Sequence, residues 1–304
     1  MKRLIIKTFI IIIIPIIISS IIMLTKKDNR SLYSHEINAS LAYERLDSLK
    51  DTNKIVIISG SNGGFSINSK ILEDSLGMPV VNTSTHAGIG IRMQFEIYKD
   101  FLKKGDIVIF CPEYCNDWSR LYGSSALITI LSTHLPKAYS KMSLTQWYHN
   151  FSAIGIHYAA ARRHEKVEPY GGPYSASSVN SYGDISYPRE HQEIDHMYTI
   201  RGEMDKELTS YYQYIHKFSK DKGITLVYLP PTLMERNYMV RKMQIDSLEL
   251  FMKDHDIPFQ AKPERYVFDD TLYFDTPYHM TNYGADLRTL KMVEDVKRVL
   301  NKMP

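Results

Sequence analysis

Three residues of this chain have the side chains that nucleophilic acyl chemistry requires. Ser61 lies in the turn sequence SGSNGG at 59–64, directly after an apolar run, while Asp275 and His279 lie four residues apart near the end of the chain. A serine hydroxyl needs a base to remove its proton, and the base needs an acid to orient its ring. We therefore interpret Ser61 as a candidate nucleophile, His279 as its base and Asp275 as the orienting acid.

Each of these assignments has a structural alternative. A serine at the start of a helix caps free backbone N–H groups, so capping alone would also explain Ser61. An aspartate and a histidine in one loop also form ordinary structural hydrogen bonds. Pro277 forces Thr276 into an extended conformation, which lengthens the connection between Asp275 and His279 without preventing their contact.

Apolar β-branched runs predict the strands that must position these residues, in a sheet buried on both faces. Segments with helical spacing alternate with the runs, which predicts an α/β fold of three layers, α/β/α, with a mainly parallel central sheet. Ligands bind beyond the carboxyl ends of such strands, where Ser61 would lie. The predicted strands are 54–59, 79–82, 106–110 and 224–229, and the predicted helices are 36–50, one through 71–72, 93–102, 203–220, 236–255 and 282–301.

With these motifs in this order, the sequence resembles the SGNH/GDSL hydrolase superfamily, which has a flavodoxin-like fold. Residues 59–62 stand where that superfamily has its Gly-Asp-Ser turn, which places Ser61 at the nucleophile. Gly88 is similar to the glycine of the second sequence block, and Asn116 is similar to the asparagine of the third. The resemblance implies that the backbone N–H groups of Ser61 and Gly88, with the side chain of Asn116, hold the oxyanion.

The chain departs from the superfamily pattern at several positions. Ser59 and Gly60 replace the Gly and Asp of the first block, and Tyr114 replaces the third-block glycine. The acid also lies four residues before the histidine rather than three.

Polar residues after the predicted strands are expected to line the substrate pocket; they are Asn62, Asn82 and Glu113.

The most similar members of the superfamily are membrane-anchored proteins encoded with bacterial surface-polysaccharide enzymes. Some transfer acyl groups and others lack activity. The resemblance therefore implies a membrane-tethered ester hydrolase or O-acyltransferase that acts on an acylated or acyl-accepting cell-surface glycan. It also implies a membrane-bound O-acyltransferase as a further partner. The alternative is a catalytically inactive SGNH-like protein that binds glycans or assists their assembly.

Composition and charge argue against several other classes. With 44% hydrophobic and 23% charged residues, the chain is not a disordered one. Six basic residues and one acidic residue give residues 1–30 a net charge of +5, which leaves −2 for the other 274 and disfavours nucleic acid as a partner. His191 and His196 are poorly spaced for one helix face, and nucleotide-binding motifs are absent from the sequence, so we predict no metal and no cofactor.

The N-terminal segment predicts a membrane anchor. Residues 4–24 are apolar apart from Lys7, and at about 1.5 Å per residue they are long enough to cross a bilayer as a helix. Because no small-residue cleavage site follows the apolar run, we expect an uncleaved signal anchor, with a cleaved signal peptide as the alternative. The short N-terminal tail favours a single-pass protein of the cytoplasmic (inner) membrane with its domain outside.

The predicted division is therefore an anchor and linker at 1–30 and one SGNH-like α/β domain at 31–304. Residues of about 120–200 are rich in Tyr, His, Ser and Gly, and they read as an insertion over one end of the sheet, with a loop over 170–187. An aromatic rim suits stacking on sugars, although tyrosine is also common on ordinary protein surfaces.

Overall fold

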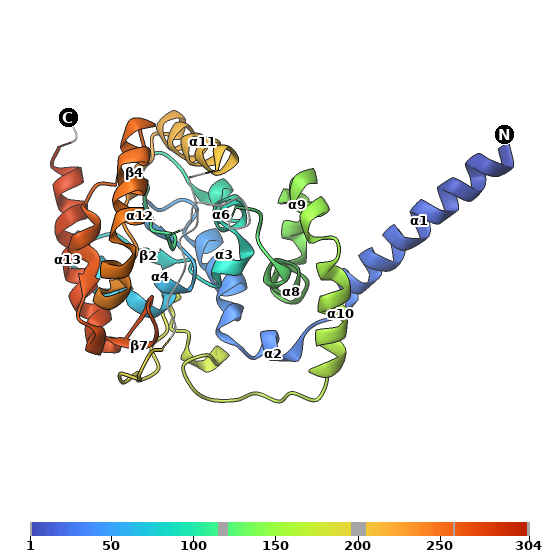
Figure 1. Cartoon of the computed structure of the whole chain (residues 1–304), viewed down its shortest axis with the longest axis horizontal. Helices are drawn as coiled ribbons and strands as arrows, with labels where there is room; N and C mark the ends of the chain where they lie inside the picture. The colour runs from blue at the N-terminus through green and yellow to red at the C-terminus, as the bar shows by residue number, and fades with distance from the viewer. Residues whose placement is uncertain (1, 115–120, 196–204, 258, 303–304) are drawn as a thin grey trace.

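The computed structural model describes residues 2–114, 121–195, 205–257 and 259–302. Its centre is a sheet of four parallel strands in the order β2-β1-β3-β4, and helices lie on either side of it (Figure 1). The predicted α/β class and the mainly parallel sheet are confirmed, and the arrangement is compatible with three layers. The central strands are β1 (Ile55–Ile58), β2 (Val80–Asn82), β3 (Ile107–Phe110) and β4 (Thr225–Tyr228).

Two small sheets lie beside the central one. A parallel pair joins β5 (Leu233–Met234) to β6 (Val267–Phe268), and an antiparallel pair joins β7 (Tyr273–Thr276) to β8 (His279–Met280). The second pair carries two of the predicted site residues.

The central strands form because their β-branched side chains are buried on both faces of the sheet. Alternate residues point to opposite faces, so each strand contributes to two separate cores. One core contains Val56, Ile58, Val108 and Phe110. The other contains Ile55, Ile57, Ile107 and Ile109, packed with residues of the helices that cover that face.

The helices have the following bounds. The α-helices are α1 (Lys2–Thr25), α2 (Asn29–Leu32), α3 (Asn38–Ser48), α4 (Ser61–Ser66), α5 (Ser69–Leu76), α6 (Ile91–Glu96), α8 (Ser125–His134), α9 (Leu144–Asn150), α10 (Ala153–Arg163), α11 (Lys206–Lys222), α12 (Glu235–Asp254) and α13 (Asn282–Leu300). The 3₁₀ helices are η1 (His35–Ile37), η2 (Ala87–Ile89), η3 (Lys99–Phe101), η4 (Pro136–Lys141), η5 (Ala176–Ser178), η6 (Pro263–Tyr266) and η7 (Asp270–Leu272).

The structure differs from the predicted helices in two places. The helix expected after the Ser61 turn is broken into α4 and α5, because Ile67 is extended and Asn68 begins a new helix by capping the Ile71 N–H. The helix expected over 93–102 is likewise divided into α6 and η3. The insertion at about 120–200 is also largely helical in its first half, through α8, α9 and α10.

The N-terminal helix α1 projects away from the rest of the molecule (Figure 1). Among the residues that the structure describes, no helix has both the length and the apolar character needed to cross a bilayer. The C-terminal end of α1 contacts α8 and α10, and Met23 is buried in the larger core. The His157 ring bonds the Lys26 carbonyl oxygen through Nε2 at 2.9 Å, and Asp28 caps α2, so the predicted linker is held against the domain.

Candidate active site

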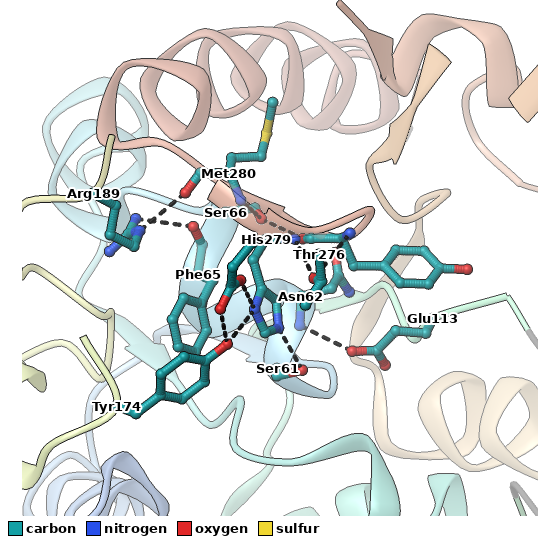
Figure 2. Close-up of polar contacts among 12 residues, drawn as sticks. Ser61, Asn62, Phe65, Ser66, Glu113, Tyr174, Arg189, Thr276, His279 and Met280 are labelled. Carbon is teal, nitrogen blue, oxygen red and sulfur yellow. Dashed lines mark hydrogen bonds and ion pairs between the residues drawn. The ribbon is translucent and has the colours of Figure 1, made fainter. Parts of the chain in front are cut away.

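Ser61 lies at the turn between β1 and α4, beyond the carboxyl end of a central strand. Gly60 is the residue before the helix, and the carboxylate of Glu113 occupies the space that a side chain at this position would enter. The Ser61 side chain is half-buried, and it points toward the hairpin formed by β7 and β8 (Figure 2).

The structure brings the three predicted residues of the acyl chemistry together. Ser61 Oγ lies 3.0 Å from Nε2 of His279, and Nδ1 of the same ring lies 3.0 Å from Oδ1 of Asp275. Because the carboxylate accepts a hydrogen bond from Nδ1–H, Nε2 is free to accept the serine proton. The geometry therefore suits a nucleophile, a base and an orienting acid.

A tight hairpin reconciles the four-residue spacing with this contact. Asp275 lies on β7 and His279 lies on β8, so the chain reverses between them at Pro277 and Tyr278. The Thr276 hydroxyl accepts the backbone N–H of His279 at 3.1 Å and holds the turn closed. The turn between β7 and β8 therefore accommodates the additional residue between Asp275 and His279.

The His279 ring is fixed by packing as well as by hydrogen bonds. It is 6% exposed and stacks on Phe65 of α4, with 4.1 Å between ring centroids and 11° between ring planes. The hydroxyl of Ser66 donates to the Tyr278 carbonyl oxygen at 2.7 Å and accepts the Met280 N–H at 3.2 Å. Helix α4 therefore carries the serine and also the surface that orients its base.

Tyr174, from the loop after α10, completes the polar chain. Its hydroxyl donates to Oδ2 of Asp275 at 2.5 Å and lies 3.0 Å from Nδ1 of His279. Burial acts to raise the pKa of Asp275, but the hydrogen bonds from His279 and Tyr174 outweigh it and hold that pKa below its usual value. The acid is therefore kept charged opposite the ring.

Arg189 is a buried residue that connects the elements around the site. Its side chain is 5% exposed and donates to the carbonyl oxygens of Phe65 at 3.0 Å and Met280 at 2.9 Å, as Figure 2 shows. It also donates to the carbonyl oxygen of Ile185. This buried guanidinium fastens α4 to β8 and to the loop at 185–189.

Two residues that were expected to line the substrate pocket serve the scaffold instead. Asn62 is fully buried; its amide donates to the Cys111 carbonyl oxygen at 2.8 Å and its side-chain oxygen accepts from Arg288 at 2.8 Å. Asn82 is also fully buried, and its amide donates to Asp184 at 2.8 Å. Because these groups already have protein partners, both side chains are held within the scaffold, and the assignment of the two residues to a substrate pocket stays a prediction.

One of the predicted oxyanion groups, the backbone N–H of Gly88, already has a partner within the protein. Glu113 accepts the backbone N–H of Asn62 at 2.9 Å, so a carboxylate lies at the turn that carries Ser61. The Gly88 N–H donates to Nδ1 of His86 at 2.9 Å, and the described contacts include no hydrogen bond between Gly88 and Ser61. Asn116 lies outside the described residues.

Comparisons with known proteins assign no family to this chain. No protein-family model, no curated protein and no solved structure matches the chain. Within the part of the chain that the structure describes, no three histidine, cysteine, aspartate or glutamate side chains gather as metal ligands would.

Sequence reasoning missed the two residues that most closely support the predicted three. Tyr174 and Arg189 come from the insertion, and no spacing relates them to Asp275 or His279. For Tyr174 the available signal was the number of polar and aromatic residues in the predicted loop at 170–187, which does not indicate which of them faces the site; Arg189 lies just beyond that loop.

Proposed function

We propose that this protein is a membrane-tethered, SGNH-like ester hydrolase or O-acyltransferase that acts on a cell-surface glycan. The observation that carries the proposal is the unbroken chain from Asp275 through His279 to Ser61, with both contacts at 3.0 Å. A serine hydroxyl in hydrogen-bond contact with an oriented, unprotonated imidazole nitrogen is an activated nucleophile.

The reaction has two balanced steps. Ser61 Oγ attacks the acyl carbonyl carbon while His279 Nε2 takes the hydroxyl proton, and the imidazolium is stabilised by Asp275. The tetrahedral intermediate then expels the alcohol oxygen, which takes the proton from His279, and the acyl group remains on Ser61. Water or a sugar hydroxyl next attacks the carbonyl carbon of the acyl-serine while His279 takes its proton. The bond to Ser61 Oγ then breaks and the serine oxygen takes that proton back, which completes hydrolysis or transfer.

Tethering is proposed from the N-terminal helix and its surroundings. Isoleucines of α1 are exposed on the described part of that helix, including Ile14, Ile17 and Ile18. Apolar side chains are also exposed on α10, which contacts α1, and on α9, which contacts α8; they include Ile156 at 57% and Leu144 at 88%. Exposed apolar surface of this extent is typical of a surface that contacts lipid or another protein.

The anchor is tested by protease digestion of intact spheroplasts. We expect the domain to be digested while the protein sediments with the membrane. Full protection would place the domain on the cytoplasmic side, and release into the periplasm would show cleavage.

The acyl chemistry is tested by covalent trapping. A fluorophosphonate probe should label the full-length protein at Ser61, as mass spectrometry of the labelled peptide would show. Ser69 is a matched control, because its hydroxyl is buried and donates to Asp184 at 2.6 Å, away from any imidazole. Labelling that persists in Ser61→Ala would contradict the proposal.

One observation favours the alternative, a glycan-binding or assembly protein without activity. The Glu113 carboxylate is bonded to the Asn62 N–H at the Ser61 turn, and the Gly88 N–H is bonded to His86. A negative charge at this turn opposes the build-up of negative charge on a reacting carbonyl oxygen. Under this alternative the protein would bind glycan and would not react with fluorophosphonate.

A further inference from the structure

Two helices of the insertion present apolar side chains to the outside of the molecule. On α9 and directly after it, Leu144 is 88% exposed, Tyr148 81% and Phe151 53%. On α10, Ile156 is 57% exposed and Tyr158 40%. We call these five side chains the α9–α10 face. Single exposed apolar residues are ordinary, but a group of large ones on neighbouring helices indicates a contact with another apolar surface.

The polarity of α9 is the reverse of that expected for a helix whose outer side meets water. Leu144, Tyr148 and Phe151 follow the i, i+4, i+7 spacing of one helix face, and all three are exposed. The buried side of the helix carries Gln146 and Asn150, whose side-chain amides have hydrogen-bond partners within the domain. These buried amides fix the orientation of α9, so its apolar residues are held outward.

The end of α1 meets α10 at the residues that carry this face. The carbonyl oxygen of Lys26, one residue beyond α1, lies 2.9 Å from Nε2 of His157, and His157 stands between Ile156 and Tyr158 in the chain. Asp28 is buried as well, so no free spacer separates α1 from the domain. Figure 1 shows α1 leaving the molecule on the side of α10.

A bilayer that holds α1 therefore has its surface beside α10. With α1 as the anchor of the proposed function, Lys26 marks the level at which the chain leaves the membrane. Tyrosine favours this headgroup level, because its ring is apolar and its hydroxyl is polar. A helix with apolar side chains on one face is stable when it lies in the plane of such an interface.

The charge of this region is complementary to a bilayer that contains anionic lipid. Residues 121–164, which include α8, α9 and α10, contain four basic residues and no acidic one, whereas the rest of 31–304 carries a net charge of −6. Arg162 and Arg163 are exposed at the end of α10, and Lys26 and Lys27 are exposed after α1. Basic side chains at this level attract anionic headgroups.

The same charge argues against a second copy of this chain as the partner. Two copies that met through the α9–α10 face would bring together two segments with a positive net charge and no carboxylates to compensate it. A bilayer offers both an apolar layer for the exposed side chains and negative charge for the basic ones.

We propose that the α9–α10 face lies on the bilayer that holds α1, with its apolar side chains at headgroup level and the neighbouring basic residues on anionic lipid headgroups. The inference rests on the tethering in the proposed function. It goes beyond that tethering because it assigns a lipid-binding surface to the domain itself, in addition to the anchor.

The test measures contact between individual side chains and lipid. Full-length protein carrying Cys115→Ser is reconstituted in nanodiscs of phosphatidylcholine and phosphatidylglycerol, and a fluorophore is attached at Leu144→Cys or at Ile156→Cys. Cys111 is fully buried and stays unlabelled. We expect lipids that carry a nitroxide near the headgroup to quench most of the emission at both positions.

Met243→Cys on α12 is the matched control for exposure. Met243 is likewise a large apolar side chain, 76% exposed, on a helix that is well separated from α10 in Figure 1. A fluorophore attached there in the same Cys115→Ser protein should keep its emission when the nitroxide lipid is present.

A pair of double variants tests the contribution of charge. Arg162→Glu with Arg163→Glu should reduce the quenching at position 156, because the end of α10 would then be repelled by phosphatidylglycerol. Lys220→Glu with Lys222→Glu makes the same change in charge in the last turn of α11 and should leave that quenching unchanged. Equal effects of the two double variants would contradict the contact with anionic headgroups.

The proposal is overturned if the labels at positions 144 and 156 keep their emission, or if they are quenched no more than the label at 243. It is also overturned if these labels are shielded from water without being quenched by lipid, since a protein would then cover the face. Sedimentation of the unaltered protein with membranes tests the anchor separately. A protein that sediments while its labels stay unquenched loses only this inference, whereas a protein that does not sediment loses the tethering and this inference together. Fluorophosphonate labelling of Ser61 reports on the acyl chemistry in either case.

Discussion

The Tyr174 hydroxyl lies 3.0 Å from Nδ1 of His279, although the two residues are 105 positions apart in the chain. The same hydroxyl donates to Asp275, so the imidazole N–H is shared between a carboxylate and a phenol oxygen. Two hydrogen bonds therefore fix the ring that faces Ser61, and they suggest which substitutions will separate catalysis from folding.

Ser61→Ala and His279→Ala should each reduce the kcat for aryl-acetate hydrolysis by about 10⁴-fold or more. The double variant should be little worse than either single one, because the two groups act as a unit. Asp275→Asn should cost about 10³-fold, since an amide cannot hold the same tautomer as firmly. Additive losses in the double variant would show that the two residues act separately.

Tyr174→Phe should lower kcat by about tenfold with a smaller effect on KM. The change removes a hydrogen bond worth about 1–1.5 kcal/mol and raises the pKa of Asp275, because the phenol donor is lost. Tyr182→Phe is the control, as its hydroxyl donates to Glu73 at 3.1 Å on another part of the surface. Equal losses in both variants would argue against a positioning role for Tyr174.

Glu113→Gln tests how the negative charge at the Ser61 turn affects the reaction. The amide keeps an acceptor for the Asn62 N–H but removes the negative charge from the Ser61 turn. If the protein is an enzyme limited by that charge, kcat should rise by about tenfold, or roughly 1.4 kcal/mol of activation free energy. A loss of activity would instead assign the Glu113 carboxylate to the reaction.

His35 predicts a specific dependence of stability on pH. Its pKa is about 3 in the folded protein and 6.5 in the unfolded chain, so the unfolded state binds the additional proton between these values. The free energy of unfolding should therefore fall as pH decreases through this window. Relative to pH 7, the contribution at pH 5 is about 2 kcal/mol.

Urea denaturation at the two pH values measures the effect directly. The difference between pH 7 and pH 5 should be about 2 kcal/mol smaller in His35→Leu than in the unaltered protein. His134, with a folded pKa of about 4 and burial as the main cause, contributes a similar effect in both proteins and cancels in the comparison. An unchanged difference would indicate that His35 is exposed to water.

Arg189→Leu should destabilise the protein by about 3–5 kcal/mol, because several buried carbonyl oxygens lose their donor. Burial lowers the pKa of Arg189 to about 10, so the guanidinium is still charged at neutral pH. Thermal unfolding measures the loss. A variant of normal stability would mean that α4 and β8 are held together by Phe65 and Ser66 alone.

The strands and the catalytic candidates could be predicted because their signals are local. A buried strand such as β1 is a continuous β-branched run, and Ser61 follows it in a turn that glycine marks. The pairing of Asp275 with His279 was visible as short spacing, although the hairpin that closes it was not.

The remaining features depend on contacts that no short pattern encodes. The interruption between α4 and α5 at Ile67 depends on a backbone conformation. The burial of Asn62 depends on its contact with Arg288, which is 226 residues away. The position of Glu113 against Gly60 similarly results from the packing of two loops. For these residues the sequence shows only a side chain able to bond, and tertiary structure selects its partner.

The packing of Met23 in the core and the bond between His157 and Lys26 have a mechanical consequence. A domain on a flexible tether samples many orientations. Here the contacts between the end of α1 and the domain hold the two in one orientation. Any surface that holds α1 therefore also sets the height and the tilt at which Ser61 meets its substrate. Under the proposed function, Ser61 would then reach only those glycan chains that come to that height above the surface.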